Sequence, residues 1–330
     1  MRSRRSSLRI CGNMRKIAIQ TSHGIYNGIA PVIISASRAT DIPAFHLDWL
    51  FQRLREGYCV WRNPFNQQQQ YISFRDLRAI VFWTKNPEPF LLRFDEVCGQ
   101  AWTYYVQFTL NDYESEGFEP NLPLLEQRIK TFQELSRRIG KDRVIWRFDP
   151  ILVSDGLLVE DIFERICFIG DRLAGYTDRL VFSFVDITNY VRVYRRLCRN
   201  PFHPRELVKA EMIRIADRLA GQGEQWQMQL SACCEQIDLT CYGITPNRCI
   251  DPELLQRLAP KDQMLTDYLT QATKDKGQRK GCGCIVSKDI GQYETCPHHC
   301  VYCYANTSYQ TVEQNKKRFG NDSETILHEP

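Results

Sequence analysis

Six short apolar runs recur through the first 235 positions of the chain, and helical patterns separate most of them. The runs are rich in β-branched and aromatic residues and span 32–37, 79–84, 104–110, 144–148, 180–185 and 227–232. Nearly continuous apolar strands of this kind are typical of a parallel sheet that is buried on both faces. The helical patterns, at 43–55, 122–139, 157–173 and 204–219, each end close to a glycine. The alternation predicts βαβ units with right-handed crossovers, and therefore an α/β fold.

Polar residues follow each predicted strand directly. They are Ser37 to Asp41, Thr84 to Asn86, Thr109 and Asn111, Arg147 and Asp149, Asp186 and Asn189, and Cys233 to Glu235. In a (β/α) barrel the carboxyl ends of all strands meet at one mouth, where the active site is built, whereas an open doubly wound sheet gathers only the residues near its switch point. We therefore expect a partial (β/α)6 TIM-like barrel over residues 31–240.

The ring of polar strand ends supplies the candidate catalytic residues. Cationic side chains at these positions can bind an anion or a carboxylate, and carboxylates there can act as acids or bases. The predicted catalytic residues are Lys85, Arg147, Asp149 and Glu235. Arg38 and Asp41 are predicted to bind a cofactor. Taken singly, a residue of this kind is more often a surface ion-pair partner or, for Asp41, a helix cap than a catalytic group.

The fourteen cysteines are distributed very unevenly. Cys59, Cys98, Cys167 and Cys198 are scattered and are interpreted as small core residues. Nine cysteines lie from position 233 onward. Because the chain shows no export signal, we expect a cytoplasmic protein, in which clustered cysteines are metal ligands more often than disulfides.

The run Cys296-Pro-His-His-Cys300-Val-Tyr-Cys303 carries the most specific spacing. Three thiolates spaced Cys-x3-Cys-x2-Cys can ligate three corners of a [4Fe-4S] cluster and leave the fourth iron open to a small molecule. This spacing, with Tyr302 directly before the last cysteine, resembles that of radical S-adenosylmethionine enzymes, in which the open iron is chelated by S-adenosylmethionine. The alternative is a structural zinc site completed by His298, His299 or another cysteine.

A second group of cysteines comprises Cys233, Cys234, Cys249, Cys282 and Cys284, with Cys241 nearby. Glycines on either side of Cys282 allow the backbone to approach a bulky ligand closely. The predicted metal ligands are Cys234, Cys249, Cys282 and Cys284, which would hold a second cluster or a zinc ion. The alternatives are that these thiols help to ligate the first centre or pack as free thiols.

The charge pattern excludes several classes of partner. Residues 1–16 contain six basic groups and no acid, and taking these six from the net charge of +4 leaves about −2 for the remainder. The body of the chain therefore lacks the basic footprint of a nucleic-acid-binding protein. No apolar run is long enough to span a membrane. We expect a small-molecule substrate, a disordered basic extension at 1–30, and a cysteine-rich cluster-binding segment and tail at 241–330.

Several motifs together resemble those of a known family. They are Ile34-Ser-Ala-Ser-Arg-Ala-Thr-Asp-Ile-Pro43, Val81-Phe-Trp-Thr-Lys-Asn-Pro87, Val144-Ile-Trp-Arg-Phe-Asp-Pro150, Cys249-Ile-Asp251 and the run from Gly281 to Ala305. These motifs, over roughly residues 32–308, are similar to an uncharacterised bacterial family, domain of unknown function family number 1848. That family is noted for a C-terminal cysteine cluster similar to the N-terminal one of radical S-adenosylmethionine enzymes. The resemblance implies that Cys296, Cys300 and Cys303 ligate a cluster and that Tyr302 lies near the adenine of the cofactor.

The chain differs from the radical enzymes in where the cysteine loop falls. In those enzymes the loop follows the first barrel strand, whereas here it follows the sixth predicted strand, which indicates a circular permutation or delivery of the cluster by a C-terminal extension. No Gly-Gly-Glu follows a predicted strand, and Gly221-Gln-Gly-Glu224 is interpreted as a turn.

The sequence leads to three functional hypotheses. The first is a radical S-adenosylmethionine-like enzyme that acts on a small polar substrate and is reduced by a flavodoxin or ferredoxin. The second is an iron–sulfur electron-transfer or redox-sensing protein. The third is a zinc-containing barrel hydrolase or isomerase that uses Lys85, Asp149 and Glu235.

Overall fold

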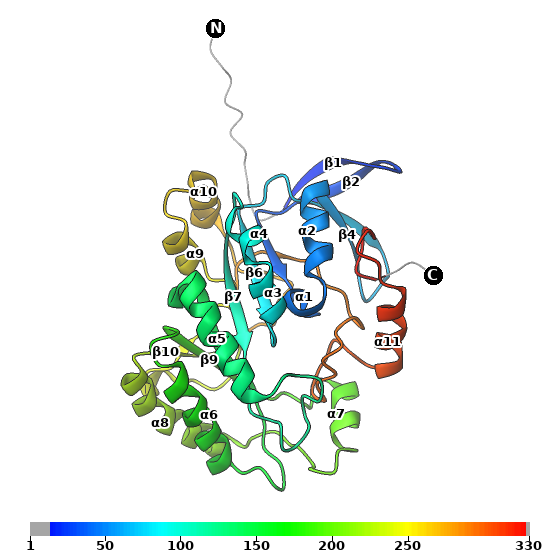
Figure 1. Cartoon of the computed structure of the whole chain (residues 1–330). Coiled ribbons are helices and arrows are strands. Elements are labelled where there is room, and N and C mark those ends of the chain that lie inside the picture. The colour runs from blue at the N-terminus through cyan, green and yellow to red at the C-terminus, as the bar shows by residue number, and fades with distance from the viewer. Residues whose placement is uncertain (1–13, 328–330) are drawn as a thin grey trace.

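The computed structural model describes residues 14–327, and its central feature is an eight-stranded sheet whose neighbouring strands all run parallel (Figure 1). From β3 to β10 the strands follow one another across the sheet in chain order. Their order in the sheet is β12 (Lys288–Asp289), β3 (Ile33–Ala36), β6 (Ala79–Thr84), β7 (Thr103–Thr109), β8 (Val144–Ile151), β9 (Arg179–Phe184), β10 (Gln229–Ala232) and β11 (Thr245–Pro246). The chain thus has a mixed α/β fold built on a large parallel sheet.

All six predicted strands are confirmed, since each coincides with one of the strands from β3 to β10 within a few residues. The two edge strands, β11 and β12, were not predicted, because two residues are too short to show any periodicity. Within the described part of the chain these edge strands pair only with β10 and β3, so the sheet does not close into a barrel.

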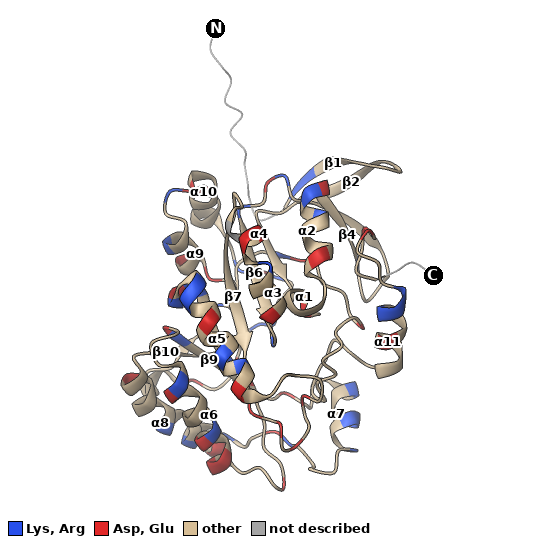
Figure 2. Ribbon diagram, in the orientation of Figure 1, with Lys and Arg blue, Asp and Glu red and all other residues tan. Residues whose placement is uncertain are grey.

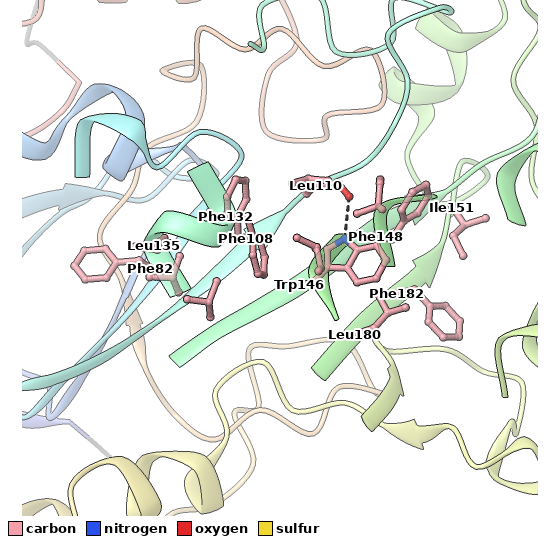
Figure 3. Packing of buried hydrophobic residues seen from close by; sticks show 14 of the residues in the cluster. Phe82, Phe108, Leu110, Phe132, Leu135, Trp146, Phe148, Ile151, Leu180 and Phe182 are labelled. Atoms are coloured by element: carbon pink, nitrogen blue, oxygen red, sulfur yellow. Dashed lines mark hydrogen bonds between the residues drawn. The ribbon is translucent and has the colours of Figure 1, made fainter. Parts of the chain in front are cut away.

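Alternate residues of the sheet pack on opposite faces. Val106, Trp146 and Leu180 belong to the larger hydrophobic core, where the Trp146 indole donates a hydrogen bond to the Leu110 carbonyl at 3.0 Å (Figure 3). The helices that bury apolar residues in this core are α2 (Leu47–Glu56), α3 (Glu88–Leu92), α5 (Leu125–Ile139), α6 (Val159–Leu173), α7 (Val191–Leu197) and α8 (Lys209–Trp226). The short helices α1 (Ile42–Phe45) and α4 (Phe94–Cys98) complete this layer.

The opposite face of the sheet is covered by the cysteine-rich segment. Tyr105, Ile145 and Val181 form a second core with buried residues of this segment. Its helices are α9 (Pro252–Leu258) and α10 (Gln263–Gln271), whereas the 3-10 turn η2 (Thr240–Tyr242) packs against α8 and the larger core. Because this segment packs on the sheet and contributes both of its edge strands, the region after residue 241 is part of the same fold.

A smaller sheet corrects the prediction for the basic extension. Residues 14–30 were expected to be disordered, but they contain the antiparallel hairpin of β1 (Arg15–Thr21) and β2 (Gly24–Ala30), while residues 1–13 lie outside the described part of the chain. The hairpin joins β5 (Gln69–Ser73) and β4 (Tyr58–Arg62) in a four-stranded sheet. In β1 the buried residues Ile19 and Thr21 alternate with the exposed residues Ala18 and Gln20, as expected for a strand with one covered face. The basic residues around this short stretch hid the alternation in the sequence.

One helix end was also predicted wrongly. Helix α8 does not stop at Gly221 but runs through Gly221-Gln-Gly-Glu224 to Trp226, so this stretch is not a turn. A Cβ at Gly223 would lie 2.7 Å from the Leu230 side chain, so the glycine allows the helix to lie close against β10. By contrast, α5 ends at Gly140 as predicted. The remaining elements are η1 (Lys141–Arg143) and helix α11 (Tyr309–Arg318).

The surface helices carry charges of both signs, as Figure 2 shows for α5, α6 and α8. An exposed ion pair between Glu160 and Arg214 at 2.9 Å connects α6 to α8. In the described residues, no helix combines the length and the apolar character that crossing a bilayer requires.

Candidate functional site

The cysteine loop reaches the carboxyl edge of the parallel sheet through β12. Lys288 and Asp289 of β12 pair in parallel with Ile34 and Ser35 of β3, so the chain leaves this strand in the same direction as the other strand ends. Gly291 then passes directly over the turn after β3. A Cβ at Gly291 would lie 1.9 Å from the Ser37 Oγ, so only glycine permits this approach.

Asp41 connects three segments of the site. Its Oδ2 accepts hydrogen bonds from the Lys85 backbone N–H at 2.7 Å and from His298 Nε2 at 2.8 Å. Its Oδ1 accepts from the Ala44 backbone N–H at 3.0 Å, which confirms Asp41 as the cap of α1. The carboxylate is buried and therefore fixes the cysteine loop to the ends of β3 and β6. Its predicted role in cofactor binding remains a prediction.

Tyr302 anchors the other end of the loop. Its hydroxyl donates to Glu119, accepts from Lys85 Nζ at 2.9 Å and accepts from Asn111 Nδ2 at 3.1 Å. Lys85 and Glu119 form a largely buried ion pair at 2.6 Å. Burial favours the neutral form of each partner, but their mutual attraction outweighs it, so the pKa of Lys85 is raised and that of Glu119 is lowered. Tyr302 is thereby held on a charged network at the ends of β6 and β7.

The backbone of the loop is held by a single arginine of α7. Arg196 donates from Nε to the Val301 carbonyl at 2.5 Å, from Nη1 to the Asn306 carbonyl at 2.8 Å, and from Nη2 to the Cys303 carbonyl. The Asn306 side chain in turn donates to the Cys296 carbonyl at 2.6 Å. These bonds fix the loop without using the cysteine side chains, which leaves the three thiols available as ligands.

The three loop thiols are partly or fully buried, and their role as cluster ligands remains a prediction. Burial raises the pKa of Cys296 to about 12 and raises that of Cys300 as well. Among residues 14–327 no three His, Cys, Asp or Glu side chains are arranged round one point to hold a metal ion. Ligands of a [4Fe-4S] cluster bind different irons and need not converge on one point.

The histidines of the loop are engaged through one ring nitrogen each. His298 Nε2 contacts Asp41, and His299 Nε2 lies 3.3 Å from Glu313. The Nδ1 atoms of both rings are buried and have no hydrogen-bond partner in the described residues. These two nitrogens are therefore the ones that the zinc alternative would use.

The predicted residues Arg147 and Asp149 are in contact with each other near the end of β8. Arg147 donates from Nε to Asp149 at 3.1 Å and from Nη1 to Gln107 at 3.2 Å. Burial works to raise the pKa of Asp149, but Arg147 and a hydrogen bond from Ser183 leave it lowered. Asp149 is therefore a carboxylate in this site.

Glu235 differs from the other acids of the ring. Its Oε1 accepts a hydrogen bond from the Phe184 backbone N–H at 2.9 Å. Burial, with a smaller contribution from the charge of Asp149, raises the pKa of Glu235 to about 7. It is thus suited to exchange a proton near neutral pH.

Arg38 lies between the turn after β3 and Trp83. Its guanidinium is 5.0 Å from the centre of the Trp83 ring, and that of Arg147 is 5.2 Å from the same ring. Trp83 packs against the second core and therefore also borders the site. The Nη2 atom of Arg38 is buried and has no hydrogen-bond partner among the described residues, so it is a free donor.

The second group of predicted ligands is only partly as expected. The Cys249 Sγ lies 3.4 Å from the Sγ of Cys233, not of the predicted Cys234. Cys234 has a left-handed backbone conformation, with φ of 62°. Its side chain instead lies near Gly281, where a Cβ would be 3.6 Å from the Cys234 Sγ. The Ile250 backbone N–H donates to the Cys284 Sγ at 3.4 Å, which places Cys284 beside the Cys249 segment.

Three important residues were not predicted. Glu119 lies in an irregular loop ten residues beyond the end of β7, where no strand period points to it. Asn111 follows a predicted strand but was not selected, although it contacts both Tyr302 and the Asp149 carbonyl, the latter at 3.1 Å. Arg196 resembles the other arginines of α7, and no sequence signal distinguishes it.

One comparison with known proteins identifies the family. Residues 33–305 match the family described as "Domain of unknown function (DUF1848)", and the chain belongs to it. Neither the curated proteins nor the solved structures include a match.

Proposed function

We propose that this member of the family is an iron–sulfur enzyme of the radical S-adenosylmethionine type, acting on a small polar substrate at the carboxyl edge of a partial barrel. Cys296, Cys300 and Cys303 would hold a [4Fe-4S] cluster with one open iron. The proposal combines the donor set of the loop with the position of the loop in the fold.

The observation that carries the proposal is the pairing of β12 with β3. In chain order the cysteine loop comes after the last barrel strand, but in sheet order β12 is the first strand and the loop follows it directly. This is the place that the loop occupies in the radical enzymes, after the first strand. A circularly permuted order of strands explains both the late position of the loop and its contact with the sheet edge.

The cofactor would use the open iron and the charged groups beside it. When both are bound, the cluster supplies one electron to the sulfonium of S-adenosylmethionine, which yields methionine and a deoxyadenosyl radical. Arg38 is the best candidate to bind the carboxylate of the cofactor, because its Nη2 is a buried donor with no partner within residues 14–327. Lys85 and Arg147 are hydrogen-bonded to carboxylates, whereas Arg38 pairs with Asp289 at the longer distance of 4.0 Å.

The substrate would contact the remaining polar strand ends. Glu235, with a pKa of about 7, can accept or return a proton. Asp149 stays ionised and can bind a hydroxyl or amino group of the substrate. Lys85 and Arg147, as permanent cations, would orient an anionic part of it.

The chemistry also implies a partner and a cellular setting. A cluster that must be reduced for each cycle requires a one-electron donor, for which a flavodoxin or ferredoxin is suited. Free cysteines throughout the described residues are compatible with the reducing cytoplasm.

The test is anaerobic reconstitution of the full chain with iron and sulfide, followed by reduction and addition of S-adenosylmethionine. We expect methionine and 5′-deoxyadenosine to form, and the Cys300→Ala variant to form neither. A cluster that forms without any cleavage of S-adenosylmethionine, with or without candidate polar substrates, would instead favour the electron-transfer or redox-sensing hypothesis.

A second candidate rests on the two unpartnered Nδ1 atoms of His298 and His299. With a loop cysteine they could bind zinc and support a hydrolase that uses Lys85, Asp149 and Glu235. Metal analysis separates the two proposals, because stoichiometric zinc with no iron or sulfide would exclude the cluster.

A further inference from the structure

Four cysteine side chains outside the loop come together from three separate segments. Cys233 follows β10, Cys249 precedes α9, and Cys282 and Cys284 lie in the turn that leads to β12. The Cys233 and Cys249 sulfurs are 3.4 Å apart. The Ile250 backbone N–H, next to Cys249, donates to the Cys284 Sγ at 3.4 Å, and Cys282 lies two residues before Cys284. The four thiols therefore gather at one place in the fold.

The sulfurs of Cys249 and Cys284 accept hydrogen bonds from surrounding N–H groups. Arg147 Nη1 lies 3.2 Å and Asn247 Nδ2 3.0 Å from the Cys249 Sγ, and the Ile250 backbone N–H donates to the Cys284 Sγ at 3.4 Å. A neutral thiol is a weak acceptor, so buried donors directed at it would gain little. Such N–H···S bonds are typical of thiolates that bind a metal, whose charge they help to balance.

The spacing of the first pair is closer to that of metal ligands than to that of a disulfide. Two sulfurs on one tetrahedral zinc, at about 2.3 Å each, lie about 3.8 Å apart, whereas a disulfide requires about 2.05 Å. No three of the thiols surround one point as they stand in the described residues. Cys282 and Cys284 must therefore rotate toward Cys249, and the turn that carries them contains Gly281 and Gly283, whose backbones can adopt more conformations than those of other residues.

The segment 241–290, which covers one face of the sheet, contains little regular structure that could hold it in place. Between residues 241 and 290 its strands have only two residues each, and its helices, α9 and α10, have seven and nine. Apart from these short elements, the segment is held on the face of the sheet by the second hydrophobic core. A metal that joins distant parts of a chain adds its binding energy to the stability of the fold.

We propose that Cys233, Cys249, Cys282 and Cys284 hold a single tetrahedral soft cation, zinc or ferrous iron, which fastens the 241–290 segment to the end of β10. This centre replaces the predicted ligand Cys234 by Cys233. It is structural and does not depend on a cluster in the Cys296–Cys303 loop.

The test uses cobalt(II) as an optical probe of thiolate ligation. The full chain with Cys296→Ser, Cys300→Ser and Cys303→Ser is purified anaerobically, stripped with a chelator and titrated with cobalt(II) chloride. We expect one cobalt per chain, with the ligand-field bands of a tetrahedral thiolate site, and displacement by zinc. Adding Cys249→Ser should weaken binding at least 10-fold, whereas adding Cys234→Ser or the exposed Cys198→Ser should change it less than 2-fold.

Three results would overturn the proposal. They are the lack of a thiolate band in the triple variant, a band that Cys249→Ser leaves unchanged, and a Cys233–Cys249 disulfide in the anaerobically purified chain by mass spectrometry. If circular dichroism shows that the triple variant does not fold, the test is the metal content of the single variants instead. Cys249→Ser should then lose one equivalent of zinc or iron that Cys300→Ser retains, and equal metal contents would refute the site. Which metal is lost distinguishes zinc from iron.

Discussion

His298 Nε2 lies 2.8 Å from the Asp41 Oδ2, although 257 residues separate the two along the chain. This contact joins the cysteine loop, late in the sequence, to the turn after β3, the first of the predicted strands. Both side chains are buried, so the contact helps to fix the position of the three loop cysteines.

Asp41→Asn should destabilise the fold, because it removes the charge that binds His298 and the Lys85 N–H group. We expect the free energy of unfolding to fall by about 1–3 kcal/mol, measured by urea denaturation, and the loop at 296–303 to exchange its amide hydrogens faster. Asp155→Asn is the matched control, since Asp155 pairs with His203 at the same 2.8 Å distance but on the surface. That variant should lose less than about 0.5 kcal/mol. Equal losses would show that the buried pair has no special role.

Glu119→Gln should leave the Lys85 ammonium without its partner in a largely buried position. The expected cost is about 3 kcal/mol, because breaking one half of a buried pair strands the other charge. Urea denaturation would measure it, with Glu160→Gln, at an exposed ion pair, expected to cost less than about 1 kcal/mol. A cost for Glu119→Gln no greater than that of the control would contradict the described network.

Gly291→Ala should displace the approach to the cysteine loop, since the new methyl group would lie 1.9 Å from the Ser37 Oγ. We expect a loss of about 1–3 kcal/mol from overpacking, together with a lower iron content after reconstitution. Gly156→Ala, at a position with nothing within 4 Å of the new Cβ, serves as the control and should retain both stability and iron. Full retention of iron in Gly291→Ala would contradict the idea that cluster binding depends on how the chain after β12 approaches the site.

His46 should make stability depend on pH. Burial lowers the pKa of His46 in the folded protein to about 4, against 6.5 in an unfolded chain. Between these two pKa values the unfolded state binds a proton that the folded state does not bind. The free energy of unfolding therefore decreases as the pH falls from about 6.5 to 4, by about 3 kcal/mol in total. His46→Leu should become more stable relative to wild type as the pH falls through this range, measured by urea denaturation at each pH. The exposed His23→Gln variant should follow wild type, and parallel curves for all three chains would contradict the burial of His46.

The six inner strands of the large sheet could be predicted because each is a nearly continuous apolar run followed by polar residues. The β12 strand could not, because Lys288 and Asp289 are charged and two residues show no period. The order of strands across the sheet, which places the cysteine loop beside β3, is a tertiary property that no local pattern records.

The site was predictable where its residues directly follow strands, as Asp41, Lys85 and Asp149 do. Glu119 and Arg196, which hold the cysteine loop, come from an irregular loop and a surface helix and have no such signal. The choice between Cys233 and Cys234 depended on one backbone angle, the left-handed φ of Cys234, which turns the second cysteine away from Cys249.

The most direct measurement is the iron and sulfide content of the anaerobically reconstituted chain, compared between wild type, Cys300→Ala and Cys198→Ala. Cys300 is a buried thiol of the loop, whereas Cys198 is exposed at the end of α7 and serves as the matched control. We predict about four irons and four sulfides per chain in wild type and in Cys198→Ala, and loss of this cluster in Cys300→Ala. Equal iron and sulfide contents in all three proteins would contradict the assignment of the Cys296–Cys303 loop as the cluster site.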